Sequence, residues 1–241
     1  MKLSLPNVTL LGIDCVNVER LQKALDISSD RIEFGAVKLL TSLPTSDVRK
    51  VEIPHIGSID EYSRFVIGEL YQHVDTEYVL LVQYDGFVLN PDAWENAFLE
   101  YDYIGAPWFV ADWSVKNFDF PKEMIGTYVV GNGGFSLRSK RFLDTCAQLA
   151  QTDVFDVYHP EDVALCVWHR HDLEKVGMKF APTDIALRFS YEGDGDLGGK
   201  DDIYTDEFGF HGFRWTDIAN WTQKNPQWEI QNSHISKNRL N

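Results

Sequence analysis

The run YVLLVQYDG, residues 78–86, constrains the fold more than any other segment of this chain. Its residues 79–82 are all apolar, which is typical of a strand covered on both faces of a sheet. The run ends on one carboxylate, Asp85, followed by Gly86. Because ligands of open α/β sheets bind beyond the carboxyl ends of the strands, we expect Asp85 to face a ligand. Gly86 would let that ligand approach the backbone.

Strand-like and helix-like segments alternate through the first hundred residues. The predicted elements are strands at residues 8–15 and 32–40 and helices at residues 17–27 and 59–74. Ser58 or Asp60 is a suitable N-cap for the second helix. The order strand, helix, strand, helix, strand predicts an α/β class with a Rossmann-like, mainly parallel sheet flanked by helices.

The pattern after residue 100 predicts a smaller mixed region. A short helix at 90–98 precedes this region. The region is expected to begin with a strand at 103–108, an irregular aromatic segment at 112–125 and a strand with a glycine-rich turn at 128–137. Helices at 139–150 and 161–171, a strand at 179–187, a loop at 191–202 and a last strand or turn at 208–213 follow. Because the sequence has no internal repeat and no clear linker, we expect one domain over residues 1–241.

Composition excludes several functions. The net charge of -15 and the pI of about 4.8 argue against nonspecific nucleic-acid binding and against docking on an anionic membrane. The three cysteines are far apart in sequence, which fits buried thiols in a reducing cytoplasm better than disulfides. No apolar segment approaches the ~18 residues of a membrane span, and the N-terminus lacks a signal-peptide cleavage site.

Two further motifs carry groups that bind or react. Residues 131–136 read GNGGFS, and their three glycines either expose backbone N–H groups to a close ligand or form a tight turn without one. Glu161 and Asp162 open a helix after Pro160, where the helix dipole favours acids whatever their function.

Taken in order, these motifs resemble a known family. They are VTLLGIDC, the helix with Tyr62 and Arg64, VLLVQYDGFVLNP, YDYIGAPW, VGNGGFSLRS, HPEDV and FGFHG. Together they resemble a bacterial family of uncharacterised glycosyltransferase-like proteins with the GT-A nucleotide-diphospho-sugar transferase fold. The resemblance runs from about Val8 to about Phe213 and implies a nucleotide-binding half at about 1–100, an acceptor-side half at about 101–213 and a C-terminal tail at 214–241.

The resemblance implies a metal site at the end of the central strand. GT-A enzymes carry an Asp-x-Asp motif there that binds Mn²⁺ or Mg²⁺ and, through it, the donor diphosphate. Here the motif reads Gln83-Tyr84-Asp85, so only Asp85 matches, and an amide is a poorer metal ligand than a carboxylate. His211 resembles the histidine that many GT-A enzymes supply from a late loop as a further ligand.

The resemblance also assigns a base. The Glu161-Asp162 pair resembles the GT-A x-Glu-Asp motif, in which one carboxylate removes the proton of the acceptor hydroxyl. We favour Asp162 as the base, with Glu161 as the rival. A base here implies direct displacement with inversion, although retention stays open. On the sugar and acceptor side we expect Asn132, Gly133 and Gly134, with Trp108 stacking on a sugar ring.

The remaining expected contacts are to the donor nucleotide. Asp14 ends the first strand, where GT-A folds hold the base and ribose. Arg64 would pair with diphosphate or with Asp85. The other donor-side candidates are Tyr62, Gln83, Asp85 and Gly86.

The sequence therefore predicts a cytoplasmic glycosyltransferase for polysaccharide biosynthesis. It would move a sugar from a nucleotide-diphosphate donor, UDP by default as the commonest in this fold, to a hydroxyl of a glycan, lipid-linked or protein acceptor. The main alternative is a domain that binds nucleotide or glycan without catalysis, which the amide of Gln83 supports. A nucleotide-sugar hydrolase and an unrelated α/β binding protein also stay open, as does the oligomeric state.

Overall fold

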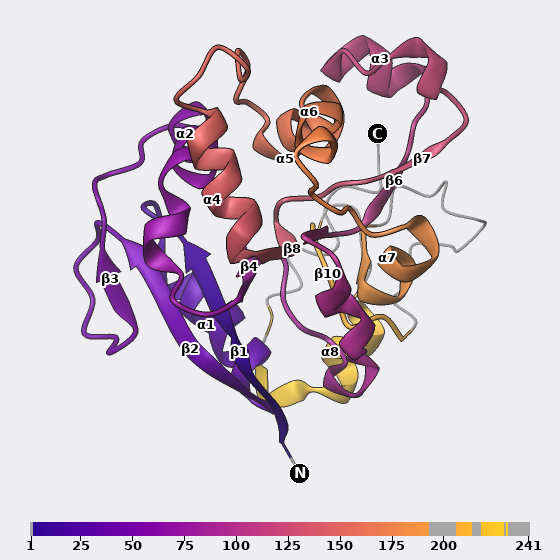
Figure 1. Ribbon diagram of the computed structural model, residues 1–241. Helices are drawn as coiled ribbons and strands as arrows, with labels where there is room; N and C mark the ends of the chain where they lie inside the picture. Colours follow the sequence, from indigo (N-terminus) through magenta and orange to yellow (C-terminus); the bar gives the residue numbers. More distant parts are fainter. Residues whose placement is uncertain (1, 193–205, 214–217, 229, 231–241) are drawn as a thin grey trace.

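A six-stranded sheet in the order β3-β2-β1-β4-β8-β5 lies at the centre of the fold (Figure 1). Its strands are β1 (Leu3–Ile13), β2 (Ile32–Thr41), β3 (Lys50–Glu52), β4 (Tyr78–Val82), β5 (Tyr103–Ile104) and β8 (Phe135–Ser139). The computed structural model describes residues 2–192, 206–213, 218–228 and 230. The pairs β1–β2, β1–β4 and β2–β3 are parallel, whereas β8 runs antiparallel between β4 and β5. The expected α/β class with a mainly parallel sheet is confirmed.

The central strand β4 is buried on both faces, as its apolar run predicts. Residues 79–82 are fully buried. Because alternate side chains of a strand point to opposite faces, Leu80 packs with the core that contains α1 (Val18–Ser29). Leu81 packs on the other face against α2 (Ile59–Gly68) and α4 (Lys140–Leu149). Helices on both faces explain why β4 has no polar alternation.

The N-cap of α2 is one of the two residues expected from the sequence. Ser58 is the N-cap of α2, and its hydroxyl accepts a hydrogen bond from the backbone N–H of Glu61 at 3.1 Å. The helix ends at Gly68, earlier than predicted, and a 3-10 turn follows at Leu70–His73. The short helix expected at 90–98 is likewise two 3-10 turns, Pro91–Ala93 and Asn96–Glu100.

The glycine-rich turn divides a predicted strand into two strands of different sheets. Before the turn, β7 (Tyr128–Val130) pairs with β6 (Pro107–Phe109); after it, β8 enters the main sheet. In the segment expected to be irregular, α3 (Asp112–Phe118) forms instead. Figure 1 shows α3, β6 and β7 together at one side of the molecule, beyond the edge of the main sheet.

The predicted strand at 179–187 is wrong. Residues Thr183–Phe189 form the helix α7, and Phe180 makes only an isolated bridge to Tyr103. Pro182 stands immediately before the first turn, where its missing N–H costs no hydrogen bond. Ala186 and Phe189 are both buried and three residues apart, which is a helical spacing.

The helix predicted at 161–171 is interrupted. It consists of α5 (Glu161–Val163), a π-helical turn at Ala164–Trp168 and α6 (Arg170–Lys175). One wide turn therefore separates the two acidic residues at its start from the second helix. Short π-helical turns of this kind are frequent near functional sites.

The last described elements pack on the main core. The strands β9 (Ser190–Tyr191) and β10 (Gly209–Phe210) pair in parallel. In α8 (Ala219–Lys224), the buried indole N–H of Trp221 donates to the carbonyl of Leu89 at 3.0 Å, so this part of the tail lies on the core. The rest of the tail and most of the loop predicted at 191–202 lie outside the described residues.

The cysteines are buried and free of disulfides: Cys15, Cys146 and Cys166. None of the helices in the described ranges is both long and apolar enough to cross a membrane.

We predict that Gly105→Ala destabilises the fold by about 2–3 kcal/mol, because the added methyl group would overpack rigid backbone. A Cβ at residue 105 would lie 2.0 Å from the carbonyl oxygen of Gly131 and 2.7 Å from that of Asn132. Urea unfolding measures the loss. The control is Gly68→Ala, whose Cβ would meet nothing within 4 Å; it should leave stability unchanged or raise it by up to about 1 kcal/mol. Equal effects of the two substitutions would contradict the steric argument.

Candidate active site

The predicted ligand position follows the carboxyl end of β4. The backbone N–H of Gln83 donates to the carbonyl of Gly134 at 2.9 Å, which joins the turn after β4 to the glycine-rich loop. The side chain of Asp85 is 19% exposed. Its Oδ1 atom is buried and has no hydrogen-bond partner in the described part of the chain. A buried carboxylate oxygen of this kind is suited to bind a cation.

His211 lies beside Asp85, although the two residues are far apart in sequence. The backbone N–H of Gly212 donates to the carbonyl of Asp85 at 2.8 Å, which fixes the loop after β10 against the turn after β4. The Nε2 atom of His211 lies 3.7 Å from Asp85 Oδ1 and 3.3 Å from Gln83 Oε1. The structure therefore brings the predicted metal ligands together.

Glu192 belongs to the same cluster and was missed in the sequence. Its Oε1 atom lies 3.1 Å from His211 Nδ1, and its Oε2 atom accepts a hydrogen bond from the indole N–H of Trp108. The motif around Glu192 reads YEGDGD, which has the composition of a loop and gives no signal for a partner. Only the pairing of β9 with β10 places Glu192 next to His211.

The charge of His211 depends on these neighbours. Burial disfavours the protonated ring, but the hydrogen bond with Glu192 and the charge of Asp85 outweigh it and raise the pKa of His211 to about 9. When only protein groups surround it, the ring is therefore an imidazolium at neutral pH.

The glycines of residues 131–134 hold side chains of this chain in place. A Cβ on Gly131 would lie 2.2 Å from the ring of Trp108, and one on Gly134 would lie 2.0 Å from the ring of His211. A Cβ on Gly133 would lie 2.2 Å from the carboxylate of Glu161. We expected these glycines to let a sugar approach the backbone; the positions that side chains would fill are occupied by Trp108, Glu161 and His211.

Asn132 stabilises this loop from within. It adopts a φ of 65°, a left-handed conformation that asparagine tolerates. Its Oδ1 accepts hydrogen bonds from the N–H groups of Gly134 at 2.9 Å and Phe135 at 3.2 Å. Its Nδ2 is buried without a hydrogen-bond partner among the described residues. The amide oxygen is therefore used internally, and Nδ2 is the atom left for the predicted hydroxyl contact.

The two acids after Pro160 have different environments. Glu161 is buried and pairs with the fully buried Arg138, with 2.7 Å between Oε1 and Nη2. Asp162 accepts hydrogen bonds from the backbone N–H of Gly133 at 3.0 Å and from that of Val163 at 2.9 Å. Glu161 is thus held in an ion pair, whereas the partners of the Asp162 carboxylate within the described ranges are backbone N–H groups.

These environments favour Asp162 over Glu161 as a proton acceptor. Burial, followed by the negative charge of Glu161, raises the pKa of Asp162 to about 7, and the N–H of Gly133 offsets part of this effect. A carboxylate with a pKa near the working pH combines sufficient basicity with a large ionised fraction. The choice between the two acids remains a prediction.

The donor-side candidates occupy different positions. Tyr62 accepts a hydrogen bond from Gln83 Nε2 at 3.1 Å, and burial raises the pKa of its hydroxyl. Arg64 pairs with Asp60 at 2.9 Å and lies over the ring of Tyr158, so it does not pair with Asp85.

Asp14 is joined to a cation that the sequence did not single out. Its carboxylate accepts hydrogen bonds from the N–H groups of Val16 at 2.8 Å and Asn17 at 2.9 Å, and it pairs with Arg20 at 2.6 Å. The guanidinium of Arg20 lies 3.9 Å from the ring centre of Tyr84, between the ends of β1 and β4. Arg20 also interacts electrostatically with Asp85.

The cluster contains oxygen and nitrogen atoms that are suitable ligands for a divalent cation. Asp85 offers an unpartnered carboxylate oxygen, His211 a ring nitrogen and Gln83 an amide oxygen. These are ligand types for Mn²⁺ or Mg²⁺. Over the described ranges no three His, Cys, Asp or Glu residues converge as a metal site, so the amide, water and substrate phosphates would complete the coordination.

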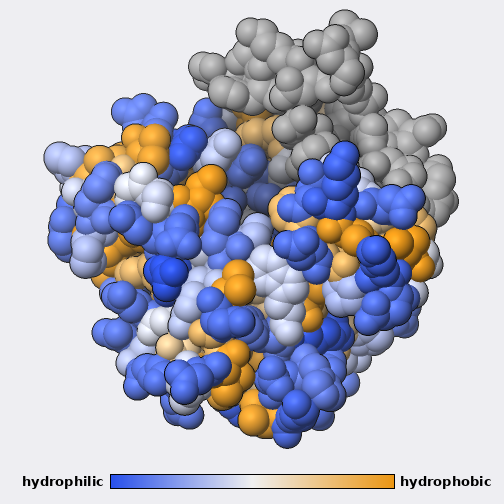
Figure 2. All heavy atoms as spheres, turned by 90° about the horizontal axis from the view of Figure 1, so that it is seen from above, coloured by the Kyte–Doolittle hydropathy of each residue, from blue (hydrophilic) through white to orange (hydrophobic). Residues whose placement is uncertain are grey.

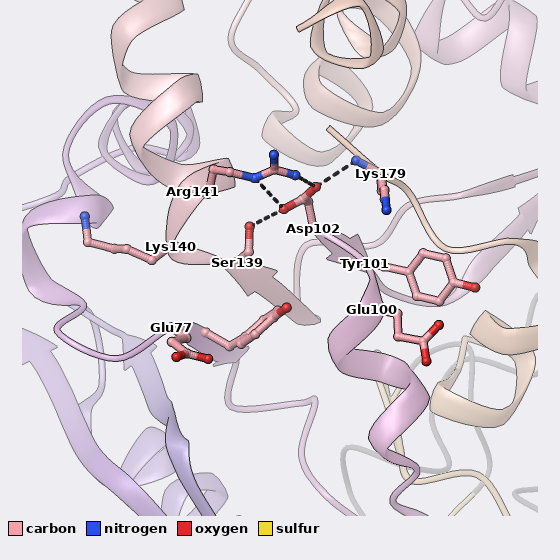
Figure 3. Close-up of a pocket in the computed structure, with 9 residues that line it drawn as sticks. Glu77, Glu100, Tyr101, Asp102, Ser139, Lys140, Arg141 and Lys179 are labelled. Atoms are coloured by element: carbon pink, nitrogen blue, oxygen red, sulfur yellow. Dashed lines mark hydrogen bonds and ion pairs between the residues drawn. The ribbon is translucent and has the colours of Figure 1, made fainter. Parts of the chain in front are cut away.

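Two hollows lie away from this cluster. The first hollow has a volume of about 370 Å³ and is lined in part by Tyr78. Because Tyr78 is the first residue of β4, this hollow lies at the opposite end of the strand from Asp85. Figure 3 shows its centre, where Asp102 accepts hydrogen bonds from Ser139, Arg141 and the N–H of Lys179. The second, of about 540 Å³, lies beside α1 and Trp228. Seen from above Figure 1, the surface is mainly hydrophilic with scattered apolar groups (Figure 2).

The fold and this cluster define an α/β protein with a polar, mainly acidic site at the carboxyl end of its central strand. The family model described as "protein of unknown function (DUF5672)" matches residues 45–211, and the chain belongs to this family. No curated protein matches the sequence.

Several solved structures overlap with the chain at low sequence identity. A glycosyltransferase involved in glycosylation of the major capsid of PBCV-1 has a TM-score of 0.47 and 12% identity, over 92% of this chain and 99% of the other. GlyE of Streptococcus pneumoniae TIGR4, a glycosyltransferase, has a TM-score of 0.46 and 16% identity, over 98% of this chain and 62% of the other. The bifunctional IspDF of Campylobacter jejuni has 0.45 and 11%, over 73% of this chain and 48% of the other, so this chain spans about half of its length.

We predict that Arg138→Met costs about 3–5 kcal/mol of unfolding free energy, because it leaves the carboxylate of Glu161 buried without a partner. The double variant Arg138→Met/Glu161→Gln should recover part of the loss. The control is Arg188→Met, which breaks a half-exposed pair with Glu95 and should cost about 0–1 kcal/mol. Urea unfolding of the wild type, the single variants Arg138→Met and Glu161→Gln, and the double variant gives the coupling energy. A double variant less stable than Arg138→Met would contradict a buried ion pair.

Proposed function

We propose that this protein is a GT-A-like glycosyltransferase that moves a sugar from a nucleotide-diphosphate donor to an acceptor hydroxyl. One observation carries the proposal: Asp85, His211 and Asp162, from three distant segments, meet around the loop of residues 131–134 at the end of β4. This is the edge at which open α/β sheets bind ligands. The arrangement combines a candidate cation site with a candidate base.

Asp85 and His211 would hold a divalent cation, with Gln83 supplying its amide oxygen. When bound, the cation would neutralise the charge that develops on the leaving diphosphate. Arg20 and Arg64 are the cationic side chains for the rest of the diphosphate, and Asp14 and Tyr62 would contact the nucleoside. UDP is the proposed nucleotide.

Asp162 would accept the proton of the acceptor hydroxyl. The N–H of Gly133 holds its carboxylate in place, and the neighbouring Glu161 is paired with Arg138. Attack by the activated hydroxyl on the anomeric carbon gives inversion. The buried Nδ2 of Asn132 and the edge of the loop formed by Gly133 and Gly134 would shape the sugar side, next to Trp108.

The biological setting extends this proposal. We propose a single catalytic domain over the chain, working in the cytoplasm on a glycan, lipid-linked or protein acceptor in polysaccharide biosynthesis. The acidic charge of -15 fits a small-molecule donor carried with a metal ion better than a nucleic-acid partner.

A second function is favoured by one specific contact. Gln83 replaces a carboxylate, and its amide is satisfied by Tyr62 on one side and faces His211 on the other. With His211 protonated, the imidazolium itself supplies a positive charge at the cation position. A domain that binds nucleotide or glycan without catalysis follows from that arrangement.

We predict that a nucleotide diphosphate, tested as UDP, GDP, CDP and their sugars, raises the melting temperature only with Mn²⁺ or Mg²⁺. A ligand at 100 times its Kd adds about 2.7 kcal/mol of stability. Asp85→Ala should abolish the shift, whereas the control Asp92→Ala, at an exposed ion pair, should keep it. A shift without product or free sugar would favour the binding domain, and free sugar without acceptor would indicate a hydrolase. No shift with any donor would overturn the transferase proposal and nucleotide binding, and a glycan-binding domain would then be tested with glycans.

We predict that kcat/KM for transfer falls about tenfold per pH unit below about pH 7, because Asp162 must lose its proton to act as a base. Asp162→Asn should lower kcat by about 10²–10⁴. The control Asp172→Asn, at a surface pair with Lys175, should keep both rate and profile. Initial rates between pH 5.5 and 8 test this. A flat profile, or an Asp162→Asn enzyme of nearly full activity, would exclude Asp162 as the base.

A further inference from the structure

A chain of three side chains connects the β6 region to the candidate cation site. The indole N–H of Trp108 donates to Glu192 Oε2, and Glu192 Oε1 lies 3.1 Å from His211 Nδ1. On its other side the His211 ring faces Asp85 and Gln83. Glu192 thus contacts Trp108 and His211, and it is His211 that faces Asp85.

The loop of residues 131–134 holds both ends of this chain. The ring of Trp108 lies where a side chain on Gly131 would be, and the ring of His211 lies where a side chain on Gly134 would be. The two rings are therefore fixed in position, and Glu192 bridges them. The position of the ring does not by itself determine which nitrogen of the neutral His211 ring carries the proton.

The contact of Nδ1 with the carboxylate of Glu192 determines which nitrogen carries that proton. A carboxylate can only accept, so Nδ1 is the donor and carries hydrogen. In the neutral ring the lone pair is then on Nε2, which faces Gln83 Oε1 at 3.3 Å and Asp85 Oδ1 at 3.7 Å. Gln83 presents its oxygen because its Nε2 donates to Tyr62. With the ring neutral, three acceptor atoms therefore face one another, an arrangement that a cation between them would stabilise.

We propose that Glu192, anchored by Trp108, is a positioning residue for the divalent cation: it holds His211 with Nε2 directed at the ion. Metal-bound histidines generally donate their other N–H to a carboxylate or carbonyl, which fixes the ring and strengthens it as a ligand. This inference rests on the proposed cation site of Asp85 and His211. It gives Trp108 a role through its N–H group, in addition to the predicted stacking on a sugar.

The test is Mn²⁺ binding to the full chain without donor, measured by electron paramagnetic resonance of free Mn²⁺. Glu192→Ala should bind Mn²⁺ about 10–100-fold more weakly than the wild type. Glu192→Gln, whose amide oxygen still accepts from Nδ1, should lose less, and Trp108→Phe should show a loss between wild type and Glu192→Ala. The control Glu174→Ala removes a carboxylate from a surface pair with Arg170 and should bind as the wild type does.

A second readout reports the tautomer directly. Nitrogen chemical shifts of the His211 ring, recorded with Mg²⁺, should show Nδ1–H in the wild type and in Glu192→Gln, and a mixture of tautomers in Glu192→Ala. Far-ultraviolet circular dichroism and the melting temperature establish that each variant is folded; if Glu192→Ala is not, the isosteric Glu192→Gln and Trp108→Phe proteins decide the question.

The outcomes separate this inference from the proposed function. If the wild type binds Mn²⁺ and Asp85→Ala does not, but Glu192→Ala binds normally with an unchanged tautomer, the role of Glu192 is overturned and the cation site stands. If the wild type binds no Mn²⁺, both are overturned. Weakened binding and a changed tautomer in Glu192→Ala, with partial rescue by Glu192→Gln, would support the proposal.

Discussion

The packing of side chains against the bare backbone of residues 131–134 is the constraint on which the rest of the site depends. Trp108, Glu161 and His211 each occupy the space of a missing Cβ. The carbonyl of Gly134 also accepts the N–H of Gln83, so the same loop holds the end of β4. Groups that are more than a hundred residues apart in sequence therefore meet because three of the four residues of one short loop are glycines.

Charge is the second organising factor, because the site is acidic inside an acidic protein. The buried Arg138 compensates Glu161, and His211 and Arg20 compensate the carboxylates at the ends of the strands. Asp162 has no ion pair with a described side chain, and burial beside Glu161 raises its pKa to about 7. Burial, followed by the negative charge of Glu161, therefore makes Asp162 a stronger base than an exposed aspartate.

Much of the sheet could be predicted from the sequence, whereas the second half of the chain could not. The run at residues 79–82 identified β4, and the helical spacing identified α1 and α2, because local periodicity reflects burial on one or both faces. The strand predicted at 179–187 became α7, since short apolar runs fit either state. The predicted cluster of Asp85 with His211 came together, but Arg64 pairs with Asp60 and Glu192 went unnoticed.

The sequence alone determined the class of fold, the position of Asp85 at the end of its central strand and the presence of a glycine run, because these depend on neighbours within a few residues. The tertiary structure decided which side chains fill the space beside the glycines, that Glu161 pairs with Arg138, and that Glu192 contacts His211. Those properties depend on burial and on contacts between distant segments, which no local sequence pattern encodes. A glycine in the sequence does not indicate whether a ligand, an aromatic ring or solvent fills the space beside it.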